Sequence, residues 1–132
     1  MREIIFRAKE EPYGGWVEGY LVGQKHIGNW PECKPIDPET VGQYTGMTDK
    51  NGKRIFEGDI LRYTQPEDSN AYGLVKFCEY GCGGTHNVGF NIDWFGRYFT
   101  GWLRTDIGFW IKYREIEVIG NIHDNPELLE EV

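Results

Sequence analysis

Residues 41–61 read Val41-Gly-Gln-Tyr-Thr-Gly-Met-Thr-Asp-Lys-Asn-Gly-Lys-Arg-Ile-Phe-Glu-Gly-Asp-Ile-Leu61. This stretch predicts a strand, a tight turn and a second strand, and a further turn at Gly58-Asp59 that begins a third strand. Asn51-Gly52 is the clearest local signal, because a two-residue turn of the favoured primed type needs positive φ at both central residues, which Asn followed by Gly tolerates best. We therefore predict a β-hairpin centred on this pair.

The residues before this stretch predict more strands. Alternating apolar and charged residues over 2–9 predict a first strand, and Gly14-Gly15 can close a hairpin to a second strand over 16–22. Residues 23–38 contain spaced prolines, so we expect an irregular surface segment there. Extended structure resumes at 40–44.

The residues after the stretch continue the same pattern to near the end of the chain. We expect strands over 60–64, 72–80, 88–92, 98–103 and 113–119, with a loop at 65–70 and a glycine-rich tip at 80–84. Asn125 can cap a short helical turn that begins at Pro126, with Glu127 in its first turn. Leu128 and Leu129 would pack this turn onto the strands.

These elements predict a mostly β fold: a small multi-strand barrel or sandwich with a short C-terminal helical turn. Gly58-Asp59-Ile60-Leu61, followed after a polar loop by Gly73-Leu74-Val75, resembles the opening of small SH3-like barrels. No repeat or linker divides the chain, and 132 residues suit one domain over 1–132.

The composition limits the classes of function. The formal net charge of −7 disfavours a nucleic-acid binder, which normally carries a basic face. Three cysteines make a poor disulfide framework, and the N-terminal residues lack the apolar segment of a secretory signal. No apolar run approaches the roughly 20 residues that span a bilayer. We expect a reduced, cytoplasmic protein that is not in a membrane.

The spacing Cys78-x3-Cys82-x3-His86 is the one metal-like pattern. Two thiolates and an imidazole could supply three of the four ligands that zinc prefers, with Cys33, His26 or His123 as the fourth. Cys78 lies within an alternating strand, however, and a buried cysteine there serves as a small hydrophobic residue. The structural interpretation is the stronger one, so we expect neither a resident metal nor a cofactor.

No catalytic motif is present. The sequence lacks a nucleophile elbow, a phosphate-binding loop and a His-Glu-x-x-His zinc motif. Glu57 and Asp59 are spaced for one face of a strand, but we expect Asp59 to bind backbone amides in its turn and Glu57 to face solvent. Asp49-x-Asn51-Gly52 lacks the other ligands of a calcium loop and predicts a turn. We do not expect an enzyme.

The most unusual feature is the density of aromatic residues over 94–113. Basic residues are interleaved with them: Arg97, Arg104, Lys112 and Arg114. Three interpretations remain open, namely core packing, a protein interface, which is rich in Trp, Tyr and Arg, and stacking on single-stranded nucleic acid. Because the side-chain period of a strand is two, consecutive aromatic pairs cannot all point inward. Seven residues are the candidate contact set: Trp94, Arg97, Tyr98, Trp102, Arg104, Trp110 and Lys112.

Nearly the whole chain resembles the YopX family of phage and prophage proteins. The resemblance rests on Phe6-Arg7-Ala8, Trp16 with Gly19, residues 40–46, Asp49-Lys50-Asn51-Gly52, Ile55, residues 57–60, and residues 119–128. Residues 65–112 match only loosely. The resemblance implies a mostly β protein of a bacteriophage or prophage that acts in the bacterial cytoplasm, and it implies no established activity.

We therefore expect a small, non-catalytic phage accessory protein that acts by binding, either to itself as a homo-oligomer or to a host protein. The residues of segment 94–114 would carry that contact. The alternative is a nucleic-acid-associated phage protein that uses the same aromatic and basic segment.

Overall fold

The computed structural model describes residues 4–12, 14–28, 32–63, 72–82, 85–95, 107 and 116–129. In these ranges the chain is mostly strand, as the sequence predicts. It divides into two compact units, residues 1–46 and 47–132, and each contains its own hydrophobic cluster. The prediction of one domain over 1–132 stays a prediction.

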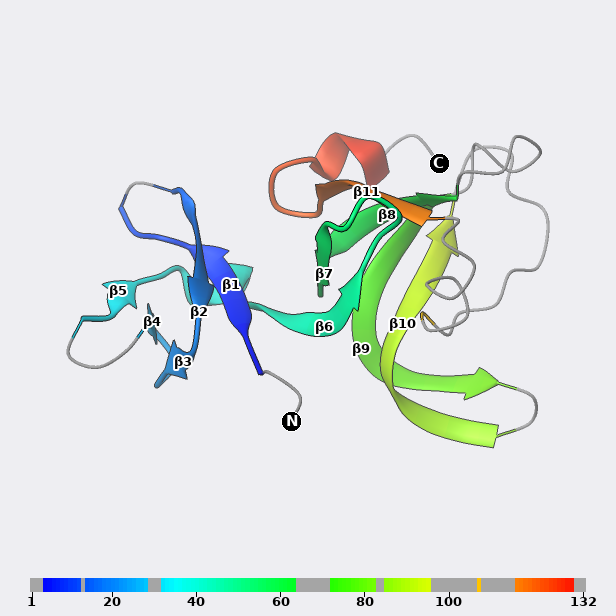
Figure 1. The fold of residues 1–132 in the computed structure, drawn as a ribbon, viewed down its shortest axis with the longest axis horizontal. Coiled ribbons are helices and arrows are strands. Elements are labelled where there is room, and N and C mark those ends of the chain that lie inside the picture. The colour runs from blue at the N-terminus through cyan, green and yellow to red at the C-terminus, as the bar shows by residue number, and fades with distance from the viewer. Residues whose placement is uncertain are drawn as a thin grey trace. The chain divides into compact units, whose positions relative to one another are not determined.

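The first unit begins with the predicted hairpin of β1 (Phe6–Lys9) and β2 (Trp16–Gly19), coloured blue in Figure 1. The hairpin closes near Gly14-Gly15, where the Glu10 amide donates to the Gly15 carbonyl at 2.7 Å. On its other side β1 pairs with the start of β6 (Gly42–Thr48). The 3-10 turn η1 (Pro38–Thr40) leads into β6, and Asp37 Oδ1 caps it by accepting from the Glu39 amide.

A second, three-stranded sheet in the first unit differs from the prediction. It contains β3 (Leu21–Val22), β4 (His26–Ile27) and β5 (Lys34–Pro35), so the predicted strand over 16–22 is two strands in different sheets. Residues 23–38 are also not wholly irregular. The reason is burial, because Ile27 and Ile36 join Ala8 in the apolar cluster of this unit. Two-residue strands are too short to show the alternation on which the prediction depended.

The predicted hairpin of residues 41–61 forms between β6 and β7 (Arg54–Phe56), but its turn is longer than predicted. The Asp49 amide donates to the Lys53 carbonyl at 2.8 Å, so three residues, Lys50, Asn51 and Gly52, lie between the closing pair. Gly52 has φ 80°, and its amide donates to the Asp49 carbonyl at 3.0 Å. A turn followed by a left-handed glycine is the usual three-residue hairpin connection, so the two-residue prediction was wrong.

The second unit is built on an antiparallel sheet in the order β10-β9-β8-β11. Its strands are β8 (Asp59–Tyr63), β9 (Tyr72–Cys82), β10 (Thr85–Phe95) and β11 (Ile116–Asn121). Of the described residues, seven buried ones belong to its core: Ile55, Leu61, Val75, Ile92, Trp94, Ile107 and Ile116. The predicted C-terminal turn is the 3-10 turn η3 (Pro126–Leu129). The described strands form three antiparallel sheets without closing a barrel.

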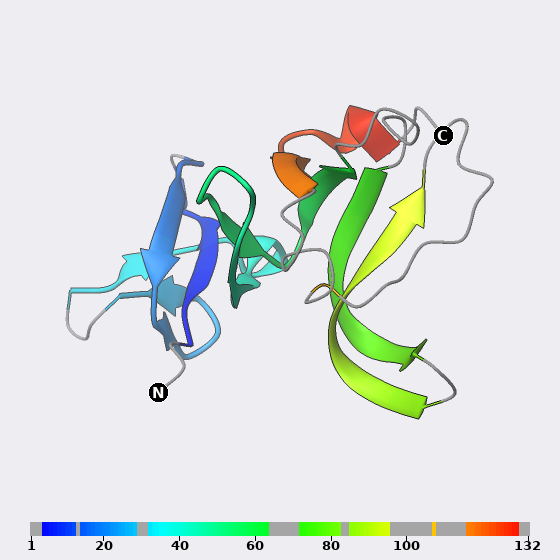
Figure 2. The same ribbon diagram turned by 45° about the vertical axis from the view of Figure 1, so that its right-hand side comes forward.

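The longest elements are β9 and β10, which pair along their whole length from Tyr72↔Phe95 to Cys82↔Thr85. By contrast, within the described ranges β8 pairs with β9 only at residues 72–74. Figures 1 and 2 show the result: the two strands form a bent ribbon that continues well past the end of β8. We call residues 76–82 and 85–91 the distal hairpin.

Candidate functional site

Of the seven contact residues predicted from the sequence, the structure describes Trp94. It lies on β10 opposite Gly73, is 9% exposed, and packs with Ile92 and Ile107 in the core of the second unit. At this position the core-packing interpretation of the aromatic residues holds. The other six lie outside the described residues: Arg97, Tyr98, Trp102, Arg104, Trp110 and Lys112.

The metal-like residues Cys78, Cys82 and His86 all lie in the distal hairpin. The register places Cys82 opposite Thr85 and His86 opposite Gly81. Their side chains lie outside the described part of the chain. Among the described residues, no group of three His, Cys, Asp or Glu side chains could hold a metal ion. A zinc site at these three positions stays a hypothesis.

The structure brings together two sequence blocks that lie some 60 residues apart, the Gly58-Asp59 turn and the segment from Gly120. Asp59 pairs with Asn121 and Ile60 pairs with Gly120, after an irregularity in the ladder between Val118 and Gly120. Gly58 is held from two sides, because its amide donates to the Val75 carbonyl and its carbonyl accepts from the Ile122 amide, both at 2.9 Å. With φ 92°, position 58 favours glycine.

Asp59 is the most deeply buried charged residue in the described chain, with 1% of its surface exposed. Its Oδ2 accepts a hydrogen bond of 2.8 Å from the Phe56 amide, across the turn. This confirms the prediction that Asp59 binds a backbone amide in its own turn. Glu57, predicted to face solvent, is half-buried.

The loop after β11 is stabilised by its own asparagine side chains. Asn121 Oδ1 accepts from the amides of His123 and Asp124, at 3.0 and 2.9 Å. Asn125 Oδ1 accepts from the Asn121 amide at 3.2 Å, and this oxygen lies so close to Gly120 that a Cβ built there would be 2.5 Å away. The side chains of Asn121 and Asn125 therefore stabilise the backbone of this loop by accepting hydrogen bonds from its amides.

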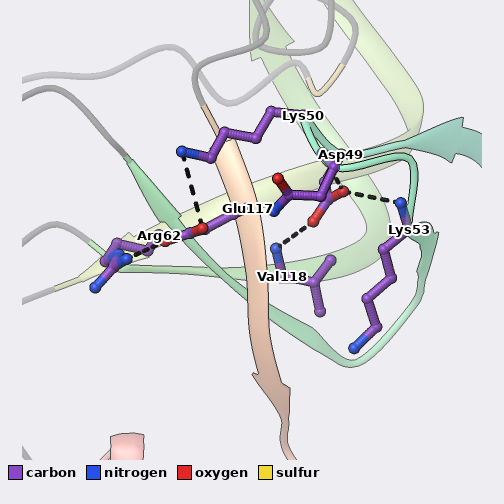
Figure 3. A network of polar contacts seen from close by, with 7 residues as sticks. Asp49, Lys50, Lys53, Arg62, Glu117 and Val118 are labelled. Carbon is purple, nitrogen blue, oxygen red and sulfur yellow. Dashed lines mark hydrogen bonds and ion pairs between the residues drawn. The ribbon is translucent and has the colours of Figure 1, made fainter.

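Asp49 connects the β6–β7 hairpin to β11. Figure 3 shows its carboxylate between the two elements, with Oδ1 accepting from the Asn51 and Lys53 amides at 2.8 and 2.9 Å. Its Oδ2 accepts from the Val118 amide at 2.9 Å. Asp49 is only 7% exposed. The sequence predicts only a turn at Asp49. In the structure its side chain also joins that turn to Val118 on β11.

Beside Asp49, Glu117 on β11 lies between two cations. Its carboxylate contacts Arg62 on β8 through a short ion pair and lies 3.9 Å from Lys50 Nζ. Lys50 and Arg62 are substantially exposed, so this network lies at the surface. Like the Asp49 contacts, it joins the hairpin turn, β8 and β11.

The distal hairpin carries an exposed aromatic residue that no sequence pattern marks as part of a binding surface. Phe77 is 52% exposed although its neighbour on the same face, Val75, is buried. The Phe77 ring meets that of Phe90 on the opposite strand edge to face, with centroids 5.1 Å apart. On the other face, Lys76 Nζ bonds to Asp93 Oδ2 at 2.9 Å. The alternation of apolar and polar residues over 72–80 shows that Phe77 and Val75 share a face of the strand. It does not show where along that face the core ends.

The first unit carries a separate aromatic and cationic group on β1 and β2. The guanidinium of Arg7 lies 4.8 Å from the ring centroid of Trp16, and Lys9 Nζ lies 5.6 Å from it. Cations at these distances are attracted to the face of an indole ring. Two of the motif residues, Arg7 and Trp16, therefore stabilise the first hairpin together.

Comparison with known proteins adds a family and a fold. The family model described as YopX protein matches residues 18–130. A solved structure, that of protein EF1440 from Enterococcus faecalis, is 24% identical over 98% of this chain and 99% of its own, with a TM-score of 0.53. A search of curated proteins found no match. No helix in the described ranges has the length and apolar character needed to span a membrane.

Proposed function

Because the chain belongs to the YopX family, we propose that it is a bacteriophage or prophage accessory protein that acts by binding another protein and not by catalysis. Its first partner would be a second copy of the same chain, and a host protein is the other candidate. We place it in the cytoplasm of the bacterial host. The observation that carries the proposal is the exposed Phe77 on the distal hairpin.

Four polar residues of the motif blocks that resemble the family support a non-catalytic role, because their side chains bind the backbone. The carboxylate of Asp49 accepts three backbone amides, and that of Asp59 accepts the Phe56 amide. Asn121 and Asn125 bind amides of their own loop. Side chains that bind the backbone in this way stabilise turns. A catalytic side chain would instead have to be directed at a substrate.

The distal hairpin supports a protein partner for an energetic reason. A two-stranded hairpin alone is marginally stable in water, because it buries little apolar surface. Here β8 pairs with the β9–β10 ribbon only near its base, and Phe77 lies beyond the buried residues Val75 and Ile92. Exposed aromatic rings commonly provide the central contacts of protein interfaces. A partner that covers Phe77 would stabilise the hairpin and gain affinity from the ring.

The test measures the self-association of the purified wild-type chain and of two matched variants. Phe77→Ala removes the exposed ring of the distal hairpin, and Tyr20→Ala removes a ring of similar exposure, 58%, in the first unit. We expect Phe77→Ala to weaken association roughly 30-fold, as loss of a hot spot worth about 2 kcal/mol does, while Tyr20→Ala leaves it unchanged.

Salt dependence separates this proposal from nucleic-acid binding through segment 94–114. Contacts made by an aromatic ring change little with ionic strength, whereas a nucleic-acid complex weakens steeply as salt rises. Binding of single-stranded DNA that falls with salt and is insensitive to Phe77→Ala would contradict the proposal.

A further inference from the structure

The Asn51-Gly52 turn is accessible to solvent, and its sequence, asparagine followed by glycine, is chemically reactive. Asn51 and Gly52 are both exposed, and a Cβ built at Gly52 would meet no atom within 4 Å. The turn is therefore open to water, and glycine after asparagine adds no side chain that would hinder attack by its nitrogen on the Asn51 side chain. We propose that Asn51 is a site of spontaneous deamidation, and that the hydrogen bonds to Asp49 set the rate of this reaction in the folded protein.

The reaction needs no reagent other than water. The backbone nitrogen of Gly52 attacks Cγ of Asn51 and forms a five-membered succinimide, and the side-chain nitrogen leaves as ammonia. Water then opens the ring at one of its two carbonyl carbons. The products are aspartate or isoaspartate at position 51, and each carries a new carboxylate. Because the attacking amide must lose its proton, the rate rises with pH.

The folded turn restrains the attacking group. The Gly52 amide donates its proton to the Asp49 carbonyl at 3.0 Å, and the Asn51 amide donates to Asp49 Oδ1 at 2.8 Å. The Lys53 amide on the other side of Gly52 is bound to the same oxygen at 2.9 Å. For ring closure the Gly52 nitrogen must lose its proton and bond to Cγ of Asn51, so its hydrogen bond to the Asp49 carbonyl must break first. The reaction is therefore slower in the folded chain than in the unfolded chain.

The consequence of the reaction extends beyond the turn. Isoaspartate lengthens the main chain by one atom, so the Asn51 and Lys53 amides can no longer both reach Asp49 Oδ1. The new carboxylate also lies close to that of Asp49, which is 7% exposed. Since Asp49 Oδ2 holds the Val118 amide at 2.9 Å, the modification loosens the contact between the hairpin and β11.

The test follows conversion at position 51 in the full chain. The protein is incubated near neutral pH with and without denaturing urea, and peptides covering the turn are separated and weighed, with isoaspartate identified by its specific enzymatic methylation. Asn51→Gln is the control, because a six-membered ring closes far more slowly and the position is exposed.

We expect conversion in the folded wild type at a rate at least about fivefold below that in urea, the factor that one ordinary hydrogen bond contributes. We expect none in Asn51→Gln. Conversion in urea alone would overturn Asn51 as a site in the folded protein. Equal rates in the two conditions would overturn the role of the turn hydrogen bonds.

Discussion

Asp49 and Val118 lie 69 positions apart in the sequence, and Oδ2 of Asp49 accepts the amide proton of Val118 at 2.9 Å. The other carboxylate oxygen of Asp49 closes its own turn through the Asn51 and Lys53 amides. One side chain therefore joins the local hairpin to β11, on which the Glu117 network also lies (Figure 3).

Replacing Asp49 should be among the more destabilising changes in the second unit. Asp49→Ala leaves three backbone amides without their acceptor, so we expect a loss of roughly 2–4 kcal/mol, given ~1.5–3 kcal/mol for a hydrogen bond to a charged group. Asp49→Asn keeps one oxygen for the turn and should lose less. Urea denaturation of the three proteins measures the difference. A loss below about 0.5 kcal/mol for Asp49→Ala, the range of ordinary surface changes, would show that the Asp49–Val118 contact contributes little.

Gly120 should not accept a side chain. A Cβ at this position would lie 2.5 Å from Asn125 Oδ1, which itself accepts the Asn121 amide. Gly120→Ala must displace that oxygen, so we expect a loss of about 1–3 kcal/mol, as for other overpacked sites.

The matched control for Gly120 is Gly15→Ala, because a Cβ at Gly15 meets nothing within 4 Å. It should change stability by less than about 0.5 kcal/mol. Thermal unfolding compares the two. Equal effects would mean that the closeness of Asn125 to Gly120 is not what requires glycine there.

The Glu117 network should contribute much less than Asp49. Arg62 and Lys50 are partly exposed, with side-chain exposures of 47% and 36%, so water and salt screen their attraction for Glu117. We expect Glu117→Gln to cost less than about 1 kcal/mol in low salt, and the cost to shrink as salt is added. Denaturation at two salt concentrations tests this. A cost that salt leaves unchanged would show that the carboxylate acts through something other than charge.

The local part of the fold could be predicted from the sequence. Hairpins at Gly14-Gly15 and Asn51-Gly52, and the short turn at Pro126, follow from residues adjacent in the chain. The type of the Asn51-Gly52 turn did not follow, because the carboxylate of Asp49 accepts the Asn51 and Lys53 amides and closes a longer loop. The contact of Asp49 with Val118 depends on the pairing of β8 with β11, which no local pattern specifies.

The candidate site was harder to predict than the fold. Trp94 and Phe77 are both aromatic residues on alternating strands, yet one is buried and the other is 52% exposed. Trp94 belongs to the core cluster that also contains Ile107, at the end of the β9–β10 hairpin where β8 pairs with β9, whereas Phe77 lies beyond that pairing. Periodicity assigns a residue to a face of the sheet, but it does not show how far along that face the core extends.

The most direct test of the proposed function is a native mass spectrum of the wild type, Phe77→Ala and Tyr20→Ala at equal concentrations. We predict a multiple of the 15.3 kDa chain mass for the wild type and Tyr20→Ala, and a shift toward the single chain for Phe77→Ala. An assembly that Phe77→Ala leaves intact would contradict the distal hairpin as the contact. A single chain for the wild type at every concentration would contradict self-association.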